Sequence, residues 1–168
     1  MLSQKTIRLA LLLLVCWGSE VSQAQQPARI DDLSDVDIPF LTQQREIIQQ
    51  LALTNLGRSF AGDRDRDLDL LQALLDQQVV LPGQIRKLQA MGVIMGDLLA
   101  DELDMHWVVY EDNIGRSRAL QWRESDNIVF PMTMISRRRE AGNETSMFDI
   151  YQKVSSTMAA RTAALPFP

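Results

Sequence analysis

The chain has 168 residues, of which 46% are hydrophobic and 23% are charged, and its formal net charge at pH 7 is −5. This length and composition predict one globular domain with a sizeable apolar core. The excess of acidic residues argues against a nucleic-acid partner, because binding to phosphate needs a basic face. It also disfavours attachment to an anionic membrane surface by charge.

The N-terminus has the pattern of an export signal. Lys5 and Arg8 precede a short apolar run over residues 9–17, and Ser22-Gln23-Ala24 places small residues where a signal peptidase reads them. We therefore expect residues 1–24 to be a signal peptide cleaved after Ala24, which makes the mature protein periplasmic or secreted. The apolar run is shorter than the roughly 20 residues of a membrane span. An integral membrane protein is not expected after cleavage.

Cys16 is the only cysteine of the chain. Lipid attachment at Cys16 is the alternative to cleavage after Ala24, but Val15 stands where a small residue is expected. Loss of residues 1–24 leaves a mature chain without cysteine. That excludes disulfides, thiol catalysis and thiolate metal ligation from the mature form.

The mature chain begins with a polar, acidic stretch, residues 25–38, whose weak apolar periodicity predicts a flexible leader. A single α+β domain is expected over residues 39–160. Its first helix spans residues 39–56, because Pro39 suits a first helical position and apolar residues follow at helical spacing.

Alternating aspartates in residues 62–69, GDRDRDLD, suggest a calcium loop. The comparison fails, because Leu68 and Leu74 stand where such a loop needs glycine and glutamate. The aspartates are better explained as caps and charges at the start of a second helix, where exposed N–H groups favour anions.

The strongest helical pattern runs from Ile85 to Leu103, and apolar residues on more than one side predict a central, buried helix. Gly92 and Gly96 lie four residues apart on one side of it. Glycine in a helix interior is less favourable than alanine by about 1 kcal/mol. The pair therefore predicts the close approach of another backbone or of a large aromatic side chain.

The same helix ends on acids, Asp97, Asp101, Glu102 and Asp104. Each is disfavoured there by about 0.3–1 kcal/mol, because the C-terminal end of a helix carries partial negative charge. A local rule broken repeatedly indicates compensation or function. The compensation would be ion pairs with Arg116, Arg118 or the arginines of residues 137–139, and the functional alternative is a ligand site.

The pattern then changes to the alternation of strands. Residues 106–111 and 116–123 predict an antiparallel hairpin, and residues 128–130 a third strand. Trp107 and Trp122 are more consistent with a core between helix and sheet than with a sugar-stacking platform.

Pro131 has no N–H for a sheet and predicts the first turn of a helix that stops before Gly142, with a continuing edge strand as the alternative. Thr145 or Ser146 can cap a final helix, and residues 161–168 are expected to form a loose tail. The expected fold is thus α+β, with N-terminal helices packed on a small three-stranded antiparallel sheet and C-terminal helices after it.

An ordered set of short motifs spans roughly residues 63–154. It comprises Gly92-x-x-x-Gly96, Trp107-Val108, Arg118-Ala119-Leu120, Phe130-Pro131, Met134-Ile135-x-Arg137-Arg138 and Ile150-Tyr151. This set resembles a bacterial family of domains of unknown function. The resemblance implies a small α+β domain of the kind found in exported proteins, and it assigns no catalytic residues.

The residues themselves give little support to catalysis. There is no Gly-x-Ser-x-Gly, no phosphate-binding Gly-x-x-x-x-Gly-Lys and no histidine pair at metal spacing. The lone His106 lies in a strand pattern and is expected to be packed or on the surface. We therefore expect a non-catalytic binding or accessory domain of the cell envelope, without cofactor or metal.

Its expected partner is an envelope protein or other envelope component. The candidate surface consists of Asp97, Asp101, Asp104, Arg137 and Arg138. The alternative is a carboxylate-dependent hydrolase or lyase, in which acids such as Asp97 would converge with Arg137 or Arg138 in a concave pocket.

Overall fold

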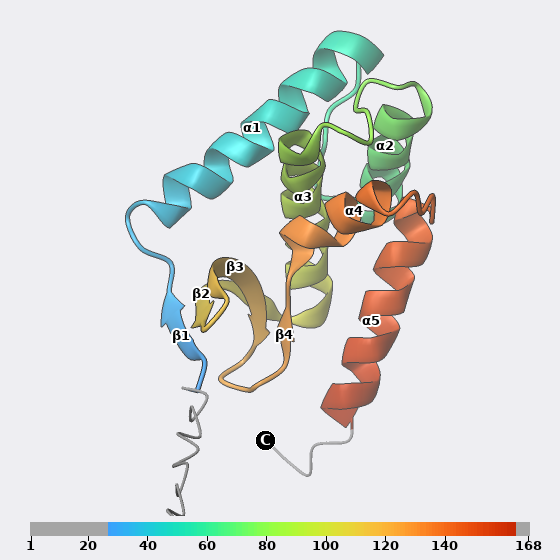
Figure 1. Cartoon of the computed structure of the whole chain (residues 1–168). Coiled ribbons are helices and arrows are strands. Elements are labelled where there is room, and N and C mark those ends of the chain that lie inside the picture. Colours follow the sequence, from blue (N-terminus) through green and yellow to red (C-terminus); the bar gives the residue numbers. More distant parts are fainter. Residues whose placement is uncertain (1–26, 164–168) are drawn as a thin grey trace, which may run out of the picture.

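A computed structural model of the chain describes residues 27–163 (Figure 1). The expected signal peptide lies outside the described residues. The elements, in order, are β1 (Arg29–Asp32), α1 (Asp37–Leu56), α2 (Arg64–Asp76), α3 (Ile85–Leu103), β2 (Met105–Asp112), β3 (Gly115–Trp122), β4 (Ile128–Val129), α4 (Pro131–Glu140) and α5 (Met147–Ala163). The α+β prediction is confirmed, and the segment after Phe130 is a helix rather than an edge strand.

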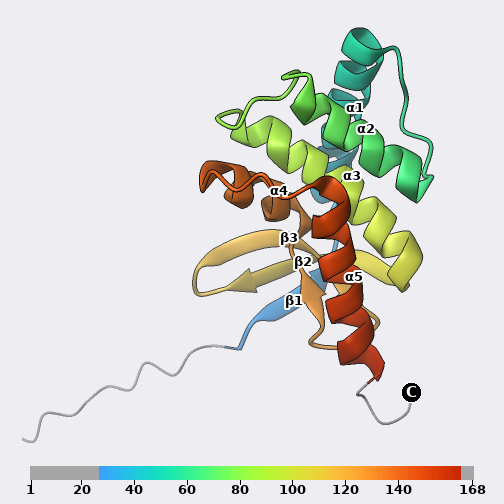
Figure 2. The ribbon, with the colours of Figure 1, turned by 90° about the vertical axis from the view of Figure 1, so that its right-hand side faces the viewer.

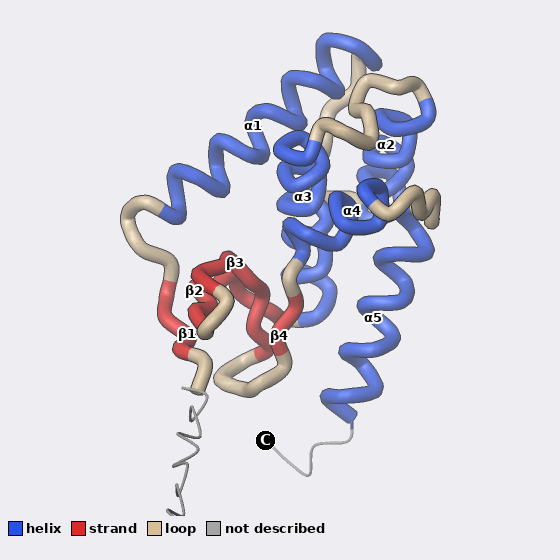
Figure 3. The backbone as a smooth tube through the Cα atoms, in the orientation of Figure 1, coloured by secondary structure: helices blue, strands red, loops and turns tan. Residues whose placement is uncertain are grey.

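The strands form one antiparallel sheet in the order β1-β2-β3-β4. In Figures 1 and 2 the sheet lies beneath α1 to α4, while α5 runs down beside it. Figure 3 shows the same separation of strands and helices by colour. Helices therefore close over the sheet from above and along one flank.

At both ends of the chain the secondary structure extends beyond the predicted elements. Residues 29–32 form the strand β1, which gives the sheet four strands instead of the predicted three. Residues 25–38 are therefore not a flexible leader throughout. The strand pairs Arg29 with Glu111 and Asp32 with Val108 along the free edge of β2. Its side chains are mostly exposed, so it carries no apolar alternation that could mark it as a strand. At the other end, α5 continues to Ala163, into the expected tail.

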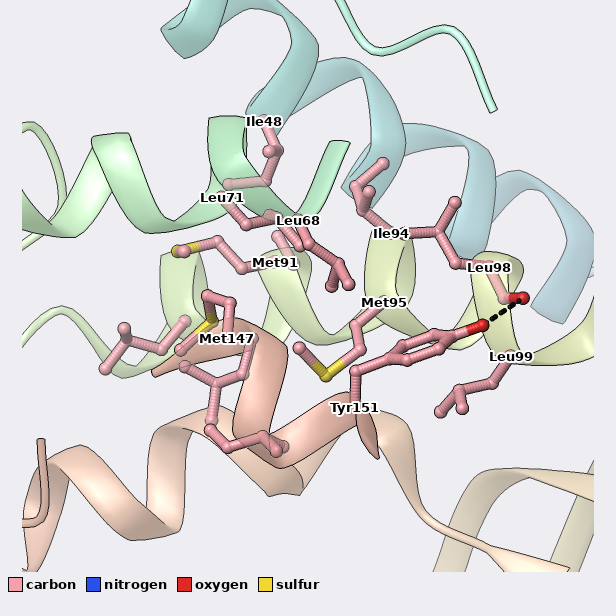
Figure 4. Close-up of a cluster of buried hydrophobic side chains, with 14 of the residues drawn as sticks. Ile48, Leu68, Leu71, Met91, Ile94, Met95, Leu98, Leu99, Met147 and Tyr151 are labelled. Carbon is pink, nitrogen blue, oxygen red and sulfur yellow. Dashed lines mark hydrogen bonds between the residues drawn. The ribbon is translucent and has the colours of Figure 1, made fainter. Parts of the chain in front are cut away.

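Helix α3 lies at the centre, as predicted. Its buried side chains pack against α1, α2 and α5 in one apolar core (Figure 4). The labelled side chains are Ile48, Leu68, Leu71, Met91, Ile94, Met95, Leu98, Leu99, Met147 and Tyr151. Each large apolar side chain buried in this way contributes about 1.5–3 kcal/mol, and α3 supplies half of those labelled.

The glycine pair of α3 is explained by two close approaches. A Cβ atom on Gly92 would lie 2.4 Å from the carbonyl oxygen of Pro131, the first residue of α4. A Cβ atom on Gly96 would lie 2.5 Å from Cζ2 of Trp107 on β2. Both a backbone and a large aromatic therefore approach the helix, as the sequence predicts.

Aspartates fix the start of α2, with Asp63 as its N-cap. Asp63 accepts a hydrogen bond from the Arg66 N–H at 2.9 Å, and buried Asp67 accepts from the N–H groups of Ala61 and Gly62. At α5, Ser146 caps the helix by accepting from the Asp149 N–H at 3.0 Å. Among residues 27–163 no three His, Cys, Asp or Glu side chains are grouped to hold a metal ion.

Candidate functional site

The acidic end of α3 is tied into the fold at Asp97. Its carboxylate accepts two hydrogen bonds from the Arg45 guanidinium, both at 2.7 Å, and one from Trp107 Nε1 at 2.9 Å. Two parallel N–H···O bonds from one arginine fix the carboxylate in direction as well as by charge. Asp97 therefore joins α1, α3 and β2.

Glu102 on the same helix is also occupied. It pairs with Arg64 at 3.0 Å, and the Tyr151 hydroxyl lies 2.9 Å from the carboxylate and 3.1 Å from the Leu98 carbonyl oxygen. Burial raises the pKa of the Tyr151 hydroxyl, and the Glu102 carboxylate raises this pKa further. The phenol consequently remains a proton donor at pH values where an ordinary tyrosine ionises.

The predicted compensation is correct in kind but wrong in its partners. Arg45 of α1 pairs with Asp97 and Arg64 of α2 pairs with Glu102, in place of Arg116, Arg118 or residues 137–139. Asp101 and Asp104 are exposed and form no ion pair within residues 27–163.

The three aspartates should therefore respond differently to neutralisation. Asp97→Asn is expected to lower the free energy of unfolding by about 1–2 kcal/mol, because it weakens charge-assisted hydrogen bonds at a partly buried position. Asp101→Asn with Asp104→Asn should leave it unchanged or raise it by about 0.5 kcal/mol, because it removes acids from a helix C-terminus. Urea unfolding measures both. Equal losses in the two variants would contradict the assignment of Asp97 as the structural member.

The strongest charge cluster surrounds Asp37, whose side chain is fully buried. Arg116 donates to both carboxylate oxygens, at 2.9 and 2.6 Å, and Arg118 donates at 2.9 Å. Hydrogen bonding from Arg116 holds the pKa of the Asp37 carboxyl well below its usual range, and Ser34 lowers this pKa further. The arginines of β3 enclose this carboxylate, so the cluster fastens the start of α1 to β3 and is structural.

A different kind of site lies between α4, α5 and β4, three elements that are labelled in Figure 1. It is a hollow of about 350 Å³, within the range of small-molecule sites. We call it the basic hollow. It is lined by Ile128, Val129, Phe130, Thr133, Met134, Arg137, Arg138, Lys153, Val154, Thr157, Met158 and Arg161.

Helical spacing produces this lining. On α5, Lys153, Thr157 and Arg161 recur every fourth residue and share one face, with Val154 and Met158 beside them. On α4 the residues four apart are Thr133 with Arg137 and Met134 with Arg138. Each helix thus presents apolar and cationic side chains to the same space.

Within residues 27–163, the cations of the basic hollow form no ion pair. Its lining contains four of them, Arg137, Arg138, Lys153 and Arg161, and no carboxylate. In the part of the chain that the structure describes, ion pairs are made by Arg29, Arg45, Arg58, Arg64, Arg116 and Arg118. Among the described residues, four positive charges therefore surround one hollow without an ion-pair partner.

The candidate residues from the sequence do not all meet there. Arg137 and Arg138 line the basic hollow, whereas Asp97, Asp101 and Asp104 do not. Arg137, Phe130 and Thr133 also line a second hollow at the tip of the β2–β3 hairpin.

The aromatic and histidine predictions can be checked directly. Trp107 and Trp122 are half-buried and pack against the core, as expected, and His106 is exposed. Lys153 and Arg161 were missed as site residues, because the sequence shows α5 only as an amphipathic helix. The only signal in the sequence is that Lys153, Thr157 and Arg161 recur every fourth residue. This recurrence indicates a site only when α4 is known to lie against that face of α5.

Comparisons with known proteins address the family and the fold. The family model described as "Domain of unknown function (DUF3806)" matches residues 67–151, half of the chain. No curated protein matches the chain significantly. Within the described residues, no helix is both long and apolar enough to cross a bilayer.

A crystal structure at 1.50 Å resolution from Bacteroides thetaiotaomicron VPI-5482 is similar, with a TM-score of 0.69 and 20% sequence identity. The match covers 77% of this chain and 47% of that one, so the chain spans about half the length of this relative. At such identity the likeness shows a shared fold and leaves function to be argued from the site. By the match of its family model, the chain belongs to the DUF3806 family of domains of unknown function.

Proposed function

We propose that this chain is an exported, non-catalytic binding domain of the cell envelope, and that its ligand site is the basic hollow. The observation that carries the proposal is the lining: four cations that form no ion pair within residues 27–163 lie beside an apolar floor, in a protein with a net charge of −5. A ligand that is anionic and partly apolar complements both features.

The chemistry of the lining favours binding over catalysis. The basic hollow has no Asp, Glu, His or Cys among its lining residues. Its hydroxyl groups are engaged with backbone, since Thr133 donates to the Phe130 carbonyl and Thr157 to the Lys153 carbonyl. No nucleophile with an adjacent general base faces the hollow. The alternative, a carboxylate-dependent hydrolase or lyase, would need an acid such as Asp97 beside Arg137 or Arg138, but the Asp97 carboxylate bonds with Arg45 and Trp107.

An anionic aromatic dye, anilinonaphthalene sulfonate, tests the proposal by its fluorescence on binding. The variant Lys153→Gln with Arg161→Gln should weaken dye binding about tenfold, because it removes two cations from the rim. The matched control is Arg66→Gln with Arg86→Gln, which removes two exposed cations that do not line the hollow. Added salt should weaken binding to the wild type and have less effect on the Lys153/Arg161 variant.

Both variants change only exposed side chains. Their free energies of unfolding in urea should therefore lie within about 0.5 kcal/mol of the wild-type value. Equal loss of dye binding in both would mean that overall charge, and not the basic hollow, governs binding. Unchanged binding in the Lys153/Arg161 variant would place the dye elsewhere. Either result refutes the proposed site.

Export is the second part of the proposal and has its own test. Mature protein recovered from the envelope fraction of the source cell should begin at Gln25, because cleavage is expected after Ala24. N-terminal sequencing or intact-mass measurement identifies the first residue. An acylated Cys16, or a chain that keeps residues 1–24 and remains in the cytoplasm, would contradict it.

A further inference from the structure

We infer that the ligand of the basic hollow is a single-chain carboxylate amphiphile, the anion of a medium-chain fatty acid. This inference rests on the proposed function and names its ligand. It follows from how apolar and charged groups are divided within the hollow.

The floor is apolar and the rim is cationic. Val129 and Met158 are buried, Met134 and Val154 are half-buried, and Arg137, Lys153 and Arg161 are exposed. A ligand with an anionic head and an apolar chain can satisfy both regions at once. Unbranched methionine side chains on opposite helices let such a floor adapt to a flexible chain.

The dimensions suit one chain. Lys153 and Arg161 are two helical turns apart on α5, about 12 Å at 1.5 Å per residue, and Val154 and Met158 lie along that span. The volume of about 350 Å³ is near the lower end for small-molecule sites. A two-chain lipid would leave much of its apolar surface in water.

The balance of forces excludes simpler ligands. Exposed ion pairs contribute little, because water screens them, so a small inorganic anion would bind weakly to the rim alone. A neutral chain would bury apolar surface but gain nothing from four unpaired cations. Only the combination uses all of the lining.

Titration calorimetry with hexanoate, octanoate, decanoate and dodecanoate, each kept below its micellar concentration, tests the inference. The Kd should fall about fourfold for each methylene added and level off once the chain exceeds the floor. Decanol should bind at least tenfold more weakly than decanoate. The Lys153→Gln, Arg161→Gln variant should weaken decanoate binding about tenfold, toward that of decanol, with Arg137 and Arg138 still in place, while the Arg66→Gln, Arg86→Gln control should not.

A floor variant separates the chain from the head. Val154→Asn, at a half-buried position, should reduce the dependence of Kd on chain length while keeping the preference for the carboxylate. Urea unfolding confirms that this variant is folded. If it does not fold, the chain-length series on the wild type still decides the inference.

The outcomes distinguish this inference from the proposed function. Dye binding that depends on Lys153 and Arg161, with no binding of any alkanoate, would overturn the inference and leave the proposed function standing. Displacement of the dye by an acidic peptide but not by decanoate would also overturn it, in favour of a protein segment. If the wild type binds neither the dye nor any alkanoate, both proposals are wrong.

Discussion

Gly92→Ala should lower the free energy of unfolding by about 2–3 kcal/mol, within the usual cost of overpacking a core. The added Cβ atom would lie 2.4 Å from the Pro131 carbonyl oxygen and 2.8 Å from the Met132 Cα atom. Both atoms belong to backbone, so α3 and α4 must separate. Alanine is the better helix former by about 1 kcal/mol, but this gain is smaller than the clash.

Two further glycine substitutions give a graded control. Gly96→Ala should cost less than Gly92→Ala, because its nearest neighbour is the side chain of Trp107 and the Pro131 ring comes next. Gly83→Ala introduces the same methyl group where no atom lies within 4 Å, and it should be neutral or slightly stabilising. Urea unfolding of the three variants should give this order. A Gly92→Ala variant as stable as Gly83→Ala would refute the close packing of α3 on α4.

The success of the glycine prediction shows which signals a sequence carries reliably. Gly92 and Gly96 are visible within one helical pattern, and a helix interior offers few other reasons for two glycines. The hairpin, the caps at Asp63 and Ser146 and the start of α4 at Pro131 depend likewise on neighbours in the chain. Such local rules were sufficient to predict the α+β class.

What the sequence could not reveal depends on pairing between distant segments. Strand β1 has exposed, mainly polar side chains, and only its partner β2 makes it a strand. Nothing near Asp97 identifies Arg45 as its partner, because the two are 52 positions apart. The basic hollow is of the same kind, since α4 and α5 contribute one face each. Periodicity identifies the faces of each helix but does not identify which faces meet.

Asp37 is the residue for which an unpredicted contact between distant segments has the largest effect on stability. It lies in the expected flexible leader, yet it is fully buried between Arg116 and Arg118 of β3. Asp37→Asn should lower the free energy of unfolding at pH 7 by about 2–3 kcal/mol, because two arginines lose their shared anion. This figure lies at or below the low end for buried pairs, since Arg116 and Arg118 are 39% and 20% exposed and water screens them in part. The control Asp35→Asn removes an exposed acid two residues away and should change stability by less than about 0.5 kcal/mol.

The effect of Asp37→Asn should also depend on pH, with a sign fixed by the lowered pKa of Asp37 in the folded protein. Between that lowered pKa and the ordinary value of 3.8, the unfolded chain binds the proton and the folded protein does not. The stabilisation is therefore complete above about pH 5 and declines as the pH falls below 4. Other carboxylates titrate in the same range in wild type and variant alike, so the difference between the two proteins isolates Asp37. Urea unfolding at pH 7, 4 and 3 should show that difference narrowing toward low pH, and a constant difference would mean that Asp37 contributes through its shape and hydrogen bonds instead of its charge.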